Sequence, residues 1–235
     1  MVVKNKKPFA VGILLTVSFL VVLALMFMPL FEGHNALVAA DQLFNSISKG
    51  STYFIPKLKK EGEVFAGQNF DVALKAKNKE NAEQIAKQLK AAGATVNVTD
   101  ESLKASGDLG KVIAAALADS DAMFHNREDE LVKKYGYAGK TALLAWWNAL
   151  KEMDKDLTRQ KSFKAAAFIA EAIKKGVEPA YNFFGIAPQT ASSRAGILVF
   201  SLVFYVAYTL WWGMAILYLF DGFGMELKAG AKKEV

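Results

Sequence analysis

The sequence contains no cysteine and only two histidines. The absence of cysteine excludes disulfides, thiolate metal sites, c-type haem attachment and iron–sulfur ligation by this chain. His34 and His125 lie far apart, and neither has a second histidine or a glutamate at metal-ligand spacing. A transition-metal site would therefore need several carboxylates from distant segments. We expect no metal, no cofactor and no catalytic residue, and we expect the chain not to be an enzyme.

Motifs for phosphate binding and nucleophilic catalysis are also missing. There is no Walker loop, no dinucleotide-binding glycine pattern and no nucleophile elbow. The densest acidic segment, Asp119 to Glu130, resembles a calcium loop only in part. Met123 stands where a ligand oxygen is needed, and Phe124 stands where glycine makes the turn. A solvated helix end followed by a turn is the better interpretation of this segment.

Charge is missing from two long runs, residues 8–31 and 195–220. As helices they would reach roughly 36 and 39 Å, enough to cross a hydrocarbon core of about 30 Å with some tilt. A cleavable signal peptide is the alternative for the first run, but its apolar stretch is about twice the usual length of roughly 7–15 residues. We expect an uncleaved anchor and a second transmembrane helix.

Lysines outside the two runs predict the orientation. They precede the first run and follow the second one: Lys4, Lys6, Lys7, Lys228, Lys232 and Lys233. The positive-inside rule then places both termini in the cytoplasm and the intervening chain in the periplasm of an inner-membrane protein. Because much of the net charge of +6 lies at these tips, no nucleic-acid-binding surface is expected.

The predicted fold is an α+β membrane protein in which two transmembrane helices flank an extracytoplasmic domain. This domain combines a small βαβ-type sheet with a helical C-terminal part. The predicted segments are a cytoplasmic tail (1–7), a first span (8–31), a periplasmic α/β part (32–127), a periplasmic helical part (128–194), a second span (195–220) and a second cytoplasmic tail (221–235).

We predict the α/β part from hydrophobic residues that recur with the periods of strands and of helices. Phe70, Val72 and Leu74 alternate with other side chains, as in a half-buried strand, and Val96 and Val98 mark a second strand. An amphipathic helix separates them, so we expect a βαβ unit, either a direct parallel pair with a right-handed crossover or a split form. A further helix should follow at about residues 110–124.

After residue 128 the hydrophobic period is helical. A seam of alternating three- and four-residue steps favours a local helix–helix contact within the domain: Leu143, Trp146, Leu150, Met153 and Leu157. Another helical stripe follows the first span and could continue that helix, lie on the bilayer or pack on the domain: Leu37, Ala40, Leu43, Phe44 and Ile47.

The second span carries polar-tipped side chains on one helical face: Ser201, Tyr205, Tyr208, Thr209 and Trp212. Trp212 lies well inside the run, whereas aromatic belts occupy its edges. Gly12 and Thr16 of the first span form a small-xxx-small pair that could receive this face. We predict that these seven residues make helix–helix contacts, either within the chain or with a partner subunit. The alternative is that the hydroxyls bond back to their own helix or face lipid.

These features favour a non-catalytic accessory or structural subunit of a larger membrane complex, respiratory or transport-related. Its expected partners are other integral membrane subunits and the lipid bilayer, with no nucleic acid, and a homo-oligomer stays open. Two alternatives have the same topology: a periplasmic sensor or ligand-binding receptor, and an assembly scaffold like the polysaccharide co-polymerases. A ligand pocket in the α/β part would favour the receptor.

Overall fold

The computed structural model describes residues 3–225. The protein is a mixed structure, 71% helical, with one small antiparallel sheet and two apolar helices. It divides into two compact units. The hairpin unit contains the described residues up to Phe44 and from Thr190 onward, and the globular unit is Asn45–Gln189.

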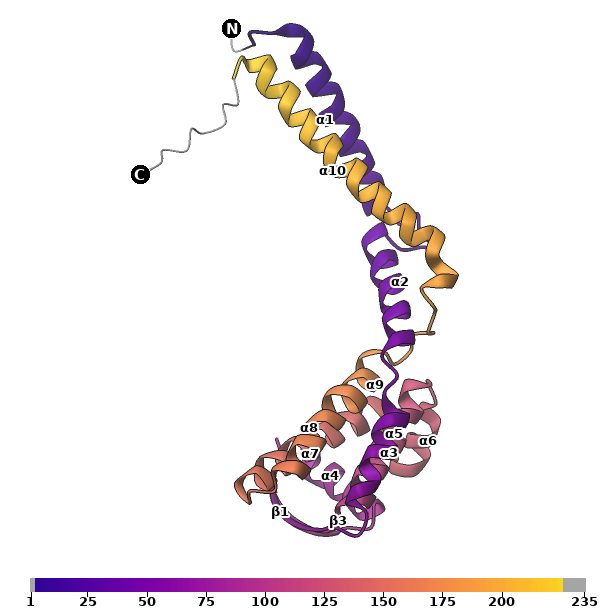
Figure 1. Ribbon diagram of the computed structural model, residues 1–235, viewed down its shortest axis with the longest axis vertical. Helices are drawn as coiled ribbons and strands as arrows, with labels where there is room; N and C mark the ends of the chain where they lie inside the picture. Colours follow the sequence, from indigo (N-terminus) through magenta and orange to yellow (C-terminus); the bar gives the residue numbers. More distant parts are fainter. Residues whose placement is uncertain (1–2, 226–235) are drawn as a thin grey trace, which may run out of the picture. The chain divides into compact units, whose positions relative to one another are not determined.

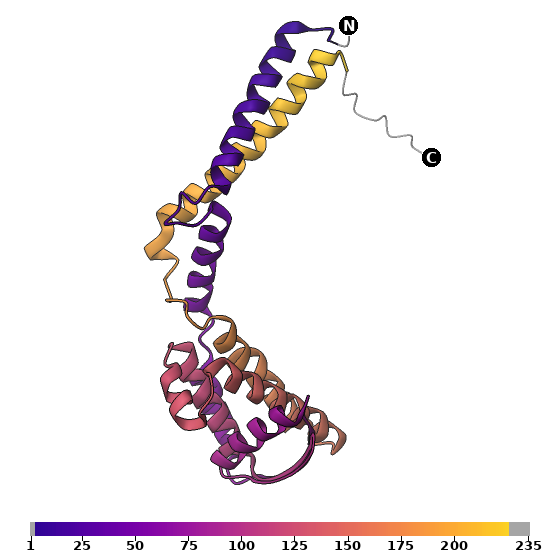
Figure 2. The same cartoon turned by 180° about the vertical axis from the view of Figure 1, so that it is seen from behind.

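The hairpin unit is built on α1 (Lys6–Phe27) and α10 (Ala195–Phe223), preceded by the short η3 (Ser192–Arg194). The two helices lie side by side in both views (Figures 1 and 2). Each is long and apolar enough to cross a membrane. The predicted basic residues Lys228, Lys232 and Lys233 lie outside the described residues.

Both helices end for local reasons. Helix α1 stops four residues before the end of its hydrophobic run, because Met28 is extended, as the residue before a proline tends to be. Helix α10 ends at Gly224, whose φ of 71° is the left-handed conformation of a helix C-terminus. Helix α10 therefore runs three residues beyond the predicted boundary at residue 220.

Helix α2 (Ala36–Ser51) spans the sequence boundary between the two units. The Asn35 side chain accepts a hydrogen bond from the Val38 amide at 2.9 Å, which caps the helix start. This segment is helical, as its hydrophobic stripe predicted. Leu37 and Phe44 of that stripe are exposed.

The sheet has three strands: β1 (Asn69–Lys75), β2 (Thr95–Thr99) and β3 (Ser102–Asp108). Their spatial order is β1-β3-β2, and both neighbouring pairs are antiparallel. The expectation of a direct parallel pair is therefore wrong, and the split form is present. Strand β3 lies between the outer strands because a two-residue loop, with Asp100 at φ 49°, folds it straight back along β2.

Helices cover one face of this sheet. Strand β1 alternates strictly between exposed and buried residues. Helix α7 (Gly139–Arg159) packs on β1, while α4 (Lys79–Ala91) packs on β2. The open edge of β1 is partly capped by α7. Its Asp156 carboxylate accepts the Ala73 amide hydrogen bond at 3.1 Å, and Gln160 donates to the Asp71 carbonyl at 2.7 Å.

The remaining helices of the globular unit complete one core, which draws on residues from both sides of position 127. The predicted seam from Leu143 to Leu157 is fully buried in it. These elements are α3 (Ile55–Gly62), η1 (Glu63–Phe65), α5 (Leu109–Phe124), α6 (Glu128–Tyr135), α7 (Gly139–Arg159), α8 (Phe163–Ala172), the π-helical η2 (Ile173–Val177) and α9 (Glu178–Asn182).

Asp119 corrects the expectation of a solvated helix end in the acidic segment. It lies inside α5 with only 4% of its surface exposed. Its carboxylate accepts hydrogen bonds from Tyr135 (2.5 Å), Trp146 (2.7 Å) and Lys134 (2.8 Å). Three donors from α6 and α7 converge on it, which is why the charge can be buried.

Candidate functional site

Glycines set the closest approaches between α1 and α10. A Cβ atom on Gly12 would lie 2.7 Å from the backbone nitrogen of Leu219. A Cβ on Gly222 would lie 2.7 Å from the Cα of Phe9. Any larger side chain at either position would push the helices apart, as in other small-residue helix contacts.

An aromatic cluster fills the middle of the same contact. The Phe19 ring stacks on Tyr208 with 4.2 Å between ring centroids, and it lies 4.6 Å from Trp212. Trp211 meets Phe19 edge-on and donates its indole hydrogen to the Leu15 carbonyl at 3.2 Å. Sequence reasoning missed Leu15, Phe19 and Trp211. The available signal was the seven-residue step from Gly12 to Phe19, which puts both on one helical face.

Three of the predicted hydroxyl groups bond back to their own helices. Thr16 donates to the Gly12 carbonyl at 2.8 Å, and Ser201 donates to the Ile197 carbonyl at 2.8 Å. Thr209 donates to the Tyr205 carbonyl at 2.7 Å. These are the four-residue back-bonds available to serine and threonine in helices. Their hydroxyl donors therefore need no second helix.

The two predicted tyrosines differ. The Tyr208 hydroxyl is buried and has no hydrogen-bond partner among the residues the structure describes. Tyr205 is 67% exposed and Trp212 is 39% exposed. Helix α1 thus covers one flank of the polar-tipped stripe and leaves Tyr205 open on the other flank.

A hydrogen-bonded lock joins the start of α1 to the end of α10. The Lys4 and Asn5 amides both donate to the Gly222 carbonyl, at 2.9 and 3.0 Å. The Asn5 side chain donates to the Asp221 carbonyl at 2.9 Å. These contacts hold the exposed lysines Lys6 and Lys7 beside the C-terminal end of α10, where positive charge is favourable.

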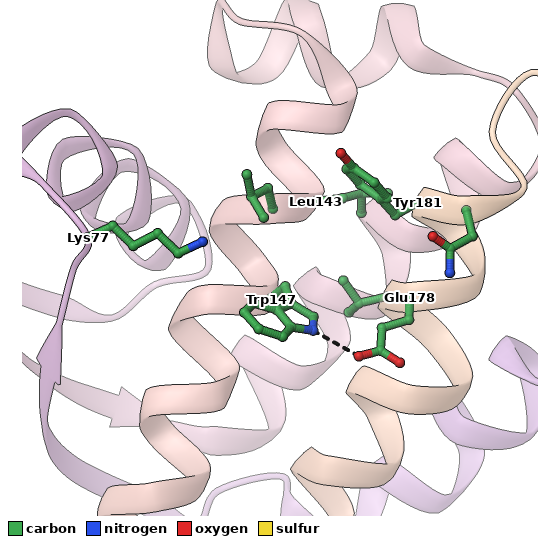
Figure 3. A pocket seen from close by; sticks show the side chains of 8 residues that line it. Lys77, Leu143, Trp147, Glu178 and Tyr181 are labelled. Atoms are coloured by element: carbon green, nitrogen blue, oxygen red, sulfur yellow. Dashed lines mark hydrogen bonds between the residues drawn. The ribbon is translucent and has the colours of Figure 1, made fainter.

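The globular unit contains a pocket of about 370 Å³, called here the Trp147 pocket. Its lining combines residues after β1, on α7 and around α9: Lys77, Leu143, Leu144, Trp147, Val177, Glu178, Tyr181 and Asn182. Figure 3 shows Lys77 reaching toward Trp147 from one side and Glu178 approaching from the other. The Trp147 indole donates to the Glu178 carboxylate at 2.9 Å. This bond fixes the orientation of the ring.

Lysine ammonium groups surround the aromatic rings of this pocket. Lys151 lies 4.3 Å and Lys77 5.8 Å from the Trp147 ring centroid. Lys140 lies 5.4 Å from the Tyr181 ring centroid. Such distances fit cation–π contacts.

A cluster of polar side chains around Asp121 is a third candidate site, after the contact between α1 and α10 and the Trp147 pocket. Tyr53 donates to the Asp121 carboxylate at 2.6 Å, Lys59 donates at 2.9 Å, and His125 stands one helical turn away. Burial raises the pKa of Asp121, but the hydrogen bonds from Tyr53 and Lys59 outweigh it and leave that pKa below its usual value. Burial and the bond to Asp121 raise the pKa of Tyr53 to about 12. The cluster ties α3 to α5.

Within residues 3–225, no group of three or more histidine or carboxylate side chains is placed to hold a metal ion. Comparison of the chain with protein-family models, with curated proteins and with solved structures gives no match. The paired helices and the Trp147 pocket are therefore the features from which a function can be inferred.

Proposed function

We propose that this chain is a non-catalytic, two-span accessory subunit of a larger membrane protein complex, respiratory or transport-related. Its termini lie in the cytoplasm, and residues 32–194 form a periplasmic domain held over the partner subunits. The inner membrane is the proposed location. Two apolar helices and the lysines beside the start of α1 support this topology.

Tyr205 carries the proposal. It lies four residues, or roughly 6 Å, from the middle of α10. At that depth its exposed hydroxyl would face hydrocarbon, where an unpaired hydrogen-bonding group is costly. A helix from a partner subunit would provide the acceptor, and a bond of this kind contributes about 0.6–2 kcal/mol.

Tyr208 supplies a matched control for Tyr205. Its ring packs on Phe19 within the hairpin, and its buried hydroxyl makes no hydrogen bond among the described residues. Removing the Tyr208 hydroxyl should leave partner binding unchanged, whereas removing the Tyr205 hydroxyl should weaken it.

The test is purification of the native complex in mild detergent, with quantification of co-purifying subunits. We expect the wild-type chain and Tyr208→Phe to retain a partner at fixed stoichiometry. The affinity for the partner subunit should fall to about one third in Tyr205→Phe. It should fall at least about ten-fold in Tyr205→Ala, in line with a bond of this strength. Purification of the wild-type chain as a monomer, or equal retention by all variants, would contradict the proposal.

A periplasmic ligand-binding receptor is the second candidate, and the Trp147 pocket is the observation that favours it. Only Lys77 of its lining comes from the α/β part, where a ligand pocket was the expected sign of a receptor. An assembly scaffold like the polysaccharide co-polymerases is a third candidate, and a ring-shaped homo-oligomer in the same purification would favour it.

A further inference from the structure

We propose that the Trp147 pocket binds a small organic carboxylate with a flat apolar body. The inference does not depend on the accessory-subunit role, because it concerns only residues of the globular unit. It rests on the pocket's walls, its charge and the hydrogen bond that fixes Trp147.

The walls are apolar and preformed. Leu143, Leu144 and Val177 line the pocket beside the rings of Trp147 and Tyr181. Val177 ends the π-helical turn η2, which directly precedes Glu178. Such turns are rare and occur frequently at functional sites, because they shift the register of the residues that follow.

The π-helical turn is packed tightly against the core. A Cβ atom on Gly176 would lie 2.9 Å from a methyl group of Leu117, so only glycine fits here without a shift. The residues after Gly176, Val177 and Glu178, lie in the pocket wall. A volume of about 370 Å³ lies in the range of roughly 300–1,000 Å³ found for small-molecule sites.

The charge around the pocket favours an anion. Three lysine ammonium groups lie over aromatic rings, and none of them forms a salt bridge within the described part of the chain: Lys77, Lys140 and Lys151. Glu178 is the one acidic residue of the lining. One of its oxygens already accepts the Trp147 hydrogen bond. A carboxylate ligand would thus lie near three ammonium groups, that of Lys77 in the lining and those of Lys140 and Lys151 beside it on the Tyr181 and Trp147 rings, while its apolar body lies against these rings.

A second hollow on the globular unit provides a contrast. It has a similar volume, about 320 Å³, and lies between η1 and α8. Its lining includes two acids, Glu61 and Glu171, and a single lysine, Lys164. It offers neither tryptophan nor excess positive charge, so we do not expect it to select anions.

The experiment uses the full-length protein in amphipol, labelled with 5-fluorotryptophan. The chain has four tryptophans, and Trp147→Phe assigns the pocket resonance in the ¹⁹F NMR spectrum. The probe is 2-naphthoate, compared with 2-naphthylmethanol, 2-naphthylmethylammonium and acetate. Trp211 and Trp212 report on partition of the probe into the amphipol.

We expect 2-naphthoate to shift the Trp147 resonance saturably, with the alcohol and the ammonium compound at least about ten-fold weaker. Acetate should not bind, because it lacks the apolar body. Lys77→Gln and Lys151→Gln should each weaken naphthoate binding roughly 3- to 10-fold, while Lys164→Gln leaves it unchanged. These lysine variants change exposed side chains, so folding should be preserved.

Three results would overturn the proposal. The first is the absence of a saturable Trp147 shift, or a shift seen equally at Trp211 and Trp212. The second is equal affinity for the carboxylate, the alcohol and the ammonium compound. The third is unchanged naphthoate affinity in both Lys77→Gln and Lys151→Gln.

Discussion

The two units of the protein differ in how far their buried polar groups are hydrogen-bonded. In the globular unit, the buried charges of Asp119 and Lys49 each have three hydrogen-bond partners within the unit. In the hairpin unit, no charged residue is buried among those described, and the buried Tyr208 hydroxyl has no hydrogen-bond partner within residues 3–225. The globular unit thus satisfies its own buried charges, whereas the contact between α1 and α10 depends on close steric fit, and Tyr205 stays exposed.

Asp119 provides the strongest test of this difference. Asp119→Ala leaves the Trp146 indole and the Tyr135 hydroxyl buried without their acceptor, and both side chains are almost fully buried. We expect the free energy of unfolding of the globular unit to fall by about 3 kcal/mol. Chemical denaturation of the full chain, followed by near-ultraviolet circular dichroism, measures this loss.

Asp121→Ala is the control, because it makes the same substitution two residues away on α5. Of the partners of Asp121, Tyr53 is exposed and Lys59 is partly exposed, so both can turn to water. The loss there should stay below about 1 kcal/mol. Equal losses in the two variants would show that burial of the Asp119 network does not determine stability.

Gly12 tests the steric fit of the hairpin. Gly12→Leu places a side chain against the backbone of Leu219, so we expect the helices to separate at a cost of about 2 kcal/mol. The chain has no cysteine, so nitroxide labels can be introduced cleanly at the exposed positions Leu14 and Val206. Double electron–electron resonance should show a longer and broader distance distribution.

Gly213→Leu is the matched control for this change. Gly213 lies in the middle of α10, and a Cβ atom there would meet nothing within 4 Å. The label distance should match that of the wild-type hairpin. A similar broadening in both variants would mean that the close approach at Gly12 does not hold the helices together.

The sequence predicted the parts of this structure that leave a periodic signal. The two uncharged runs are helical, as α1 and α10. The hydrophobic seam of α7 is buried, as its alternating three- and four-residue steps predicted. Gly12 and Tyr208 lie in the α1–α10 contact, but the back-bonded hydroxyls of Thr16, Ser201 and Thr209 show that a shared helical face does not fix each side chain's partner.

Other features leave no such signal. Strand β3 has only two buried residues, Leu103 and Ala105, and its other positions are serine, lysine, glycine and aspartate, so its β period is weak. The burial of Asp119 depends on donors that arrive from two other helices. The Trp147 pocket depends on a π-helical turn, which has no compositional signature.

The smallest expected effect is the contribution of Lys49 to the pH dependence of the free energy of unfolding. Lys49 is only 1% exposed. Its ammonium group donates to the carbonyls of Ile186 (2.6 Å) and Phe183 (3.0 Å) and to the Asn126 side chain (3.3 Å). It thereby joins the end of α2 to the segment after α9. These acceptors are mostly backbone carbonyls, which explains why the sequence gives no hint of its burial.

Burial lowers the pKa of Lys49 below its ordinary value of 10.5. The folded protein therefore releases this proton at a lower pH than the unfolded chain does. Between the lowered pKa and 10.5 the unfolded state binds more protons, so the contribution of Lys49 to the free energy of unfolding rises with pH. Lys49→Met should remove this rise and should also destabilise the unit by about 1–2 kcal/mol through the carbonyls left unpaired.

Unfolding measured between about pH 8 and 9.5, below the ordinary tyrosine range, tests this expectation with little contribution from Tyr53. Lys57→Met makes the same charge change at an exposed position of α3 and is the matched control. If Lys49→Met keeps the wild-type slope, burial does not lower the pKa of Lys49 into this pH range. The three oxygens around its ammonium group would then replace most of its hydration, and the globular unit would bury this charge without a penalty that depends on pH within the range.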